Sequence, residues 1–116
     1  MKTLKDLINE AHELIPRVTC KELSENLGEF FIVDVREGSE VMESGIIEGA
    51  TNIPRGLLEF KMVPNSDTLP THIPILVYCG GGSRAALAGK TLKELGFTNV
   101  KNLEGGFRGW KESSSS

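Results

Sequence analysis

"PILVYCGGGSRAALAGKTLKELG", residues 74–96, is the stretch that decides the fold. It opens with the continuous apolar run 74–79, which predicts a strand buried on both faces. The segment 83–96 has the residue pattern of a helix, and three successive glycines join it to the strand. A strand, a glycine loop and a helix in this order are typical of α/β proteins that hold an anion at the end of a strand.

A cysteine stands where this strand ends and the loop begins. Ligands of parallel sheets bind beyond the carboxyl ends of the strands, so Cys79 is predicted to lie at the bottom of a pocket. Gly80, Gly81 and Gly82 allow the backbone to curl and to aim consecutive N–H groups at the sulfur. Ser83 is predicted to be the N-cap of the following helix, whose positive end points into the same concavity. These features predict an anion cradle that favours the nucleophilic thiolate.

The alternative is structural: a buried cysteine acts as a small apolar residue and is followed by a flexible turn. Glycine-rich turns are common alone, but the combination of strand, cysteine, glycines and helix is much rarer. The second cysteine, Cys20, lies at a predicted helix start and is expected to be structural. Neither thiol belongs to a C-x-x-C pair, so the sequence suggests neither a zinc knuckle nor a disulfide scaffold.

The remaining segments alternate between strand and helix patterns. "FFIVDV", residues 30–35, predicts a second buried strand. Thr19 and Glu22 form a capping-box pattern for a helix that Gly28 would end. Further helices are expected over 4–15 and 55–62, and short strands over 50–53 and 99–102. This alternation predicts a parallel sheet with helices on both faces.

Four stretches in a fixed order carry a family resemblance: "FIVDVRE", "GIIEGATNIP", "VYCGGGSRAALAGKTLKELGF" and "VKNLEGGFRGW". They cover most of residues 18–111, and their order and spacing are similar to those of rhodanese-like sulfurtransferases. The resemblance implies an α/β rhodanese-like fold with a central, mainly parallel five-stranded sheet and helices on both faces. It also implies a cysteine that carries sulfur as a persulfide.

By this resemblance, Cys79 matches the persulfide-forming cysteine. The rest of the six-residue loop that binds the substrate and the persulfide is matched by Gly80, Gly81, Gly82, Ser83 and Arg84. The family often has Gly-His-Ile where this chain has Gly45, Ile46 and Ile47, outside the loop. Arg84 is the one cation of the loop, so thiosulfate is expected to serve as a test donor without being the natural one. The open glycine rim would admit a bulkier thiol or a protein persulfide.

Two charged residues, Asp34 and Arg36, lie at the C-terminal end of the strand at 30–35 and are expected at the same edge of the sheet as Cys79. A free carboxylate beside the sulfur would oppose formation of the thiolate. Asp34 is therefore expected to hold backbone amides or a guanidinium. Arg36 is either its partner or a cation that faces the substrate, and the sequence leaves both open.

Other residues have weaker claims on the site. Arg55 and Arg108 could border the pocket, but surface ion pairing is the more frequent role of such arginines. Phe107 and Trp110 are expected to anchor the C-terminal turn by burial. No histidine falls in the stretches assigned to the active edge, so a Cys–His hydrolase has no base there. No metal site and no cofactor are predicted.

The length and the net charge of the chain limit the number of domains and the kinds of partner that we expect. A chain of 116 residues with 39% hydrophobic residues is expected to form one core. Its net charge of −3 argues against nucleic-acid and anionic-membrane partners. We expect no membrane span, no signal peptide and a cytoplasmic location. The expected organisation is an amphipathic helix in 1–17 packed on the domain, a rhodanese-like domain over 18–112, and a serine tail, 113–116, that is disordered or not native.

The favoured function is a sulfurtransferase. A sulfane sulfur moves from thiosulfate or another small anionic persulfide donor, through Cys79, to a thiol or cyanide, and a protein could serve as donor or acceptor. One alternative is a non-catalytic binding module. Another is a cysteine phosphatase or arsenate reductase, but such loops resemble C-x-x-x-x-x-R, one residue longer than the spacing from Cys79 to Arg84.

Overall fold

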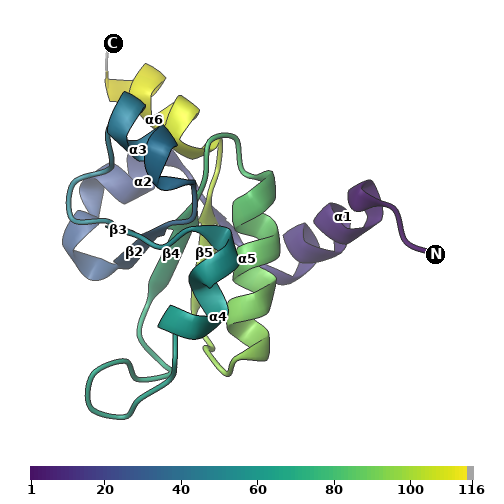
Figure 1. Ribbon diagram of the computed structural model, residues 1–116. Helices are drawn as coiled ribbons and strands as arrows, with labels where there is room; N and C mark the ends of the chain where they lie inside the picture. Colours follow the sequence, from purple (N-terminus) through teal and green to yellow (C-terminus); the bar gives the residue numbers. More distant parts are fainter. Residues whose placement is uncertain (115–116) are drawn as a thin grey trace.

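Strand β4 (Ile75–Tyr78) occupies the centre of a five-stranded sheet in which every neighbouring pair is parallel. The computed structural model describes residues 1–114 (Figure 1). The strand order is β1-β5-β4-β2-β3, and the other strands are β1 (Arg17–Val18), β2 (Phe31–Asp34), β3 (Thr51–Asn52) and β5 (Val100–Leu103). The predicted α/β fold with a parallel five-stranded sheet is confirmed.

The side chains of β4 divide the core into two layers. All four of its residues are fully buried, as the continuous apolar run predicts. Ile75 and Val77 pack into one apolar cluster, whereas Leu76 and Tyr78 pack into the other. Cys79 continues the alternation and joins the cluster of Ile75 and Val77. The sheet thus positions the thiol on a defined face.

Helices cover both faces. On the side of Cys79, α5 (Ser83–Glu94) contacts both α1 (Leu4–Leu14) and α4 (Leu58–Lys61). On the other side, α2 (Cys20–Glu25) contacts α6 (Gly106–Ser114). The remaining helical segments are α3 (Gly38–Ser44), η1 (Leu27–Glu29) and η2 (Arg55–Leu57). Within residues 1–114, no helix combines the length and the apolar character that crossing a bilayer requires.

Helix α1 packs closely against α5. A capping box between Thr3 and Asp6 begins α1, and Ala11 and Ile15 are buried at its C-terminal end. A β-carbon placed on Gly89 of α5 would lie 3.1 Å from Cγ1 of Ile15. The absence of a side chain at position 89 therefore lets the two helices approach each other.

Several boundaries differ from the sequence-based expectations. The predicted capping box of Thr19 and Glu22 is present, but α2 ends at Glu25 because Asn26 turns out of the helix and donates its side-chain amide to the carbonyl of Glu22. Gly28 lies inside η1 instead of ending α2. The patterns did not predict β1, α3 or α6. Helix α6 continues to residue 114, into the expected serine tail, and residues 115–116 of that tail lie outside the described part.

Candidate functional site

The thiol of Cys79 accepts two backbone hydrogen bonds at the end of β4. The N–H of Gly82 donates to Sγ at 3.0 Å, and the N–H of Ala85 donates at 3.4 Å. Cys79 is only 1% exposed, so the sulfur lies beneath the loop. The expected cradle of amides is present with different members, because Gly82 and Ala85 are the donors, whereas Gly80 and Gly81 give the sulfur no hydrogen bond within residues 1–114. Two amides directed at one sulfur favour negative charge on it.

The carbonyl groups of the loop are bound by donors outside the loop. The Cys79 carbonyl accepts from the N–H of Phe107 at 2.8 Å, and the Gly80 carbonyl accepts from the N–H of Arg108 at 3.1 Å. The Gly82 carbonyl accepts from the side-chain amide of Asn102, which is buried on β5, at 3.2 Å. These bonds anchor the backbone of the loop to β5 and α6.

Gly106 makes this arrangement sterically feasible. A β-carbon there would come within 2.7 Å of both the Cys79 and the Gly80 carbonyl oxygens. Its φ of +60° also lies in the left-handed region that favours glycine. The sequence-based expectations for "GGFRGW" concerned Phe107, Arg108 and Trp110 and did not include this supporting role of Gly106. The signal was present, as a glycine pair just before a helix.

Ser83 is not the N-cap of α5. Gly82 holds that position with φ +115°, and Ser83 is the first residue of the helix. The left-handed conformation turns the chain from the loop into α5, where the Ala85 amide reaches the sulfur, and a glycine adopts it without steric cost. The expectation for Ser83 was therefore wrong, but the positive end of the α5 dipole still faces the thiol.

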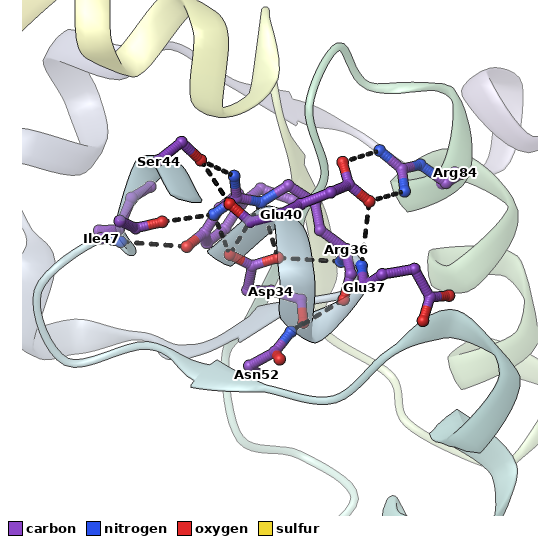
Figure 2. A network of polar contacts seen from close by, with 10 residues as sticks. Asp34, Arg36, Glu37, Glu40, Ser44, Ile47, Asn52 and Arg84 are labelled. Carbon is purple, nitrogen blue, oxygen red and sulfur yellow. Dashed lines mark hydrogen bonds and ion pairs between the residues drawn. The ribbon is translucent and has the colours of Figure 1, made fainter. Parts of the chain in front are cut away.

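The Arg84 side chain forms a two-bond ion pair with Glu40 of α3 (Figure 2). Nη1 of Arg84 donates to Oε1 at 2.6 Å, and Nη2 donates to Oε2 at 2.9 Å. The hydrogen bonds from Arg84 lower the pKa of Glu40 from 4.5 to about 2. Arg84 therefore connects the loop to α3. Glu40 was not predicted from the sequence, because spacing alone does not relate α3 to the loop.

Asp34 and Arg36 form a second pair, which is fully buried. Nη2 of Arg36 lies 2.7 Å from Oδ2 of Asp34, and Nε donates to both carboxylate oxygens at 3.1 Å. The same guanidinium donates to Oγ of Ser44 and to the carbonyl of Gly45, at the end of α3, as Figure 2 shows for Ser44. Its Cζ also lies 4.2 Å from the ring centroid of Phe107. Arg36 is thus the partner of Asp34 and links β2, α3 and α6.

The other candidates take structural positions. Arg55 pairs with Glu59 at 3.1 Å and donates to Oγ1 of Thr91, in agreement with the expected surface ion pairing. The Cys20 thiol is directed at the carbonyl of Glu104, and partial burial raises its pKa. Phe107 is buried, as expected. Among residues 1–114, no three His, Cys, Asp or Glu side chains gather as a metal site would require.

Comparison with known sequences identifies a family and several relatives. The family model described as "Rhodanese-like domain" matches residues 19–113. The thiosulfate sulfurtransferase GlpE of Shewanella oneidensis is 34% identical, with 72% of this chain and 78% of that protein covered. The uncharacterized protein YqhL of Bacillus subtilis is 40% identical over 68% of this chain. The matched part spans only 59% of YqhL.

Solved structures show the same arrangement. The human single-domain sulfurtransferase TSTD1 matches with a TM-score of 0.75 and 30% identity, over 84% of this chain and 96% of that chain. A protein from Rhodopseudomonas palustris, described as of unknown function and "Possible Tyrosine Phosphatase", matches with a TM-score of 0.86 and 31% identity. That match covers 98% of this chain and 92% of the other.

Proposed function

Because this chain belongs to the rhodanese-like family, we propose that it transfers sulfane sulfur through a persulfide on Cys79. The observation that carries the proposal is the pair of backbone N–H groups, from Gly82 and Ala85, directed at the Cys79 sulfur. A persulfide anion formed at this position would receive the same donors or their neighbours along the loop. The family and its sulfurtransferase members support an enzyme of the rhodanese type.

The first half-reaction loads the enzyme. The Cys79 thiolate attacks the outer sulfur of the donor, a bond forms between Sγ and that sulfur, and the S–S bond of the donor breaks. With thiosulfate the bonding electron pair leaves on sulfite. The amides of Gly82 and Ala85 and the positive end of α5 stabilise the negative charge that remains on the persulfide.

The second half-reaction unloads it. A thiol or cyanide attacks the outer persulfide sulfur, and the electron pair of the S–S bond returns to Cys79 as thiolate. Gly80, Gly81 and Gly82 place no side chain over the sulfur, so the acceptor approaches through a rim of backbone. Such a rim would also fit a thiol carried by a protein, and a protein donor or acceptor is part of the proposal.

The proposal places the enzyme in a reducing compartment such as the cytoplasm. Cys20 and Cys79 are both free thiols in the structure. A thiolate nucleophile must be reduced to react, and cytosolic conditions keep thiols in that form. The net charge of −3 does not favour a nucleic-acid partner.

Intact-mass measurement tests the function. Incubation with thiosulfate is expected to add one sulfur, about 32 Da, and cyanide is expected to remove it. Cys79→Ser should stay unmodified while keeping its fold, because the hydroxyl is close in size but forms no persulfide. Cys20→Ser is the matched control and should load normally. Sulfur mapped to Cys20, or no loading by any sulfane donor, would contradict the proposal.

Phosphate-ester hydrolysis is the second candidate, favoured by the description of the Rhodopseudomonas palustris protein. The loop from Cys79 to Arg84 is one residue shorter than the C-x-x-x-x-x-R loops described above, and Arg84 is engaged by Glu40. We therefore expect no hydrolysis of p-nitrophenyl phosphate by the wild-type protein. If the protein hydrolyses p-nitrophenyl phosphate and forms no persulfide, phosphate-ester hydrolysis would replace sulfur transfer as the favoured function.

A further inference from the structure

The loop that holds Cys79 contains a single cationic side chain, and an acid already neutralises it. Gly80, Gly81 and Gly82 contribute no side chains. Arg84 lies over this rim, since a β-carbon on Gly80 would be 3.5 Å from its Nη2. Its two terminal guanidinium nitrogens, Nη1 and Nη2, both donate to the Glu40 carboxylate. An approaching anion therefore meets a neutral pair instead of a free guanidinium.

Glu40 is held in place from its own helix. Its Oε1 also accepts the backbone N–H of Glu37 at 3.1 Å, in the capping box that begins α3 (Figure 2). Release of Arg84 toward an anionic donor would therefore break a two-bond ion pair whose acid is already oriented. The low pKa of Glu40, about 2, means that the carboxylate keeps its charge at neutral pH.

The other arginines near the site do not replace Arg84. Arg36 is 3% exposed and is bound by Asp34, Ser44 and Gly45. Arg55 pairs with Glu59 and Thr91. Arg108, the third residue of α6, donates its backbone N–H to the Gly80 carbonyl, but its side chain is exposed, where water and salt screen its charge.

We propose that Glu40 is a specificity-determining residue that acts through Arg84 and disfavours the dianion thiosulfate relative to donors of lower charge. The substrate class assigned here is persulfides and thiosulfonates with at most one negative charge. This inference rests on the proposed sulfur transfer. With an alkyl persulfide, the Cys79 thiolate bonds to the outer sulfur, the S–S bond of the donor breaks, and its electron pair leaves on an alkyl thiolate, so no further oxidant or reductant is needed.

Two donors with the same reacting sulfur test the proposal. Thiosulfate carries two negative charges, and methanethiosulfonate, in which a methyl group replaces one oxygen, carries one. For Glu40→Gln, kcat/KM with cyanide as acceptor should rise about threefold for methanethiosulfonate and about tenfold for thiosulfate, because Coulomb energy scales with the product of the charges. The gain should shrink as salt is added.

Three further variants separate charge from structure. Glu43→Gln removes an exposed acid from the same helix without touching Arg84. It should leave unchanged the donor ratio, which is kcat/KM for thiosulfate divided by kcat/KM for methanethiosulfonate. Glu40→Asp keeps the charge and should keep the wild-type ratio, whereas a purely structural role would make it as disruptive as Glu40→Gln or worse. Adding Arg84→Gln to Glu40→Gln should remove the rise in kcat/KM for thiosulfate that Glu40→Gln alone produces.

The outcomes distinguish this inference from the function on which it rests. If the wild type transfers sulfur from both donors and Glu40→Gln changes both rates by the same factor, the inference is wrong and the function stands. If the wild type forms a persulfide with neither donor, the proposed function itself fails. Unfolding curves of each variant show whether a lost rate reflects a lost fold.

Discussion

The carbonyl oxygen of Cys79 and the α-carbon of Gly106 pack so closely that a β-carbon on Gly106 would lie 2.7 Å from that oxygen. The contact joins the candidate nucleophile to the first turn of α6. It lets the N–H of Phe107 reach the Cys79 carbonyl at 2.8 Å. The geometry of the loop therefore depends on a glycine that never touches the sulfur.

Gly106→Ala is expected to weaken both the fold and the reaction. The left-handed conformation costs an alanine about 1–2 kcal/mol, and forcing a methyl group against two carbonyl oxygens costs about 1–3 kcal/mol more. Persulfide formation should slow at least about tenfold if the loop shifts enough to cost 1.36 kcal/mol in the barrier. Denaturant unfolding and single-turnover loading measure the two effects.

Gly81→Ala is the matched control. A β-carbon there has no neighbour within 4 Å, and Gly81 is not among the glycines with positive φ. Its stability and loading rate should stay close to wild type. Equal losses in the two variants would mean that the loop needs flexibility at every glycine and not support from α6.

Asp34→Asn should cost far more stability than a similar change at the surface. The variant leaves Arg36, which is 3% exposed, without its counter-charge, and breaking a buried pair in this way typically costs about 3–5 kcal/mol. Glu59→Gln breaks the more exposed pair with Arg55 and should cost less than about 1 kcal/mol. Urea unfolding of both variants gives the comparison. Similar losses would show that the Asp34 pair contributes no more than a surface one.

Tyr78 should resist ionisation while the protein is folded. Burial raises the pKa of Tyr78 well above the ordinary value of 10 and outweighs the opposing effect of the N–H of Ile47, which donates to its oxygen at 3.0 Å. The unfolded chain loses this proton first as pH rises, so stability should fall above about pH 10. Tyr78 is the only tyrosine of the sequence, so tyrosinate absorbance reports on it alone. Tyrosinate appearing near pH 10 in folded protein would contradict the burial argument.

The Glu40–Arg84 pair should stabilise the protein only above acid pH. The pKa of Glu40 falls from 4.5 to about 2 on folding, so its contribution is complete above about pH 5 and is lost as pH falls toward 2. The difference in stability between wild type and Glu40→Gln should follow this course. Because both side chains are more than a third exposed, the difference should be small and should decrease with salt. A difference that is constant from pH 7 to pH 2 would point to a cause other than charge.

The parts of the fold that could be predicted are those set by local pattern. The apolar run of β4 and the capping box of Thr19 follow from neighbouring residues alone, and both are present. Strand β1 could not be predicted in this way, because its two residues are a strand only through their pairing with β5. For the same reason, the sequence identified Cys79 as the candidate nucleophile but did not identify most of the residues around it.

Most of those surroundings depend on contacts between distant segments. Glu40 meets Arg84 across the site, and Asn102 reaches the Gly82 carbonyl from a different strand. Ser83 was expected to cap α5 because serine favours that position in general. Gly82 takes the position instead, because its φ of +115° lies in the left-handed region that glycine adopts readily and serine rarely does.

The donors that hold the loop carbonyls belong to β5 and α6, the last two elements of the chain. During synthesis, Cys79 is therefore made before Asn102, Phe107 and Arg108, the residues that orient its loop. Domains of this size fold as units, so the amides align on the sulfur only when the final helix docks. Before α6 docks, the chain would expose a cysteine with the reactivity of any unfolded thiol, and sulfur transfer would begin only after the docking of α6.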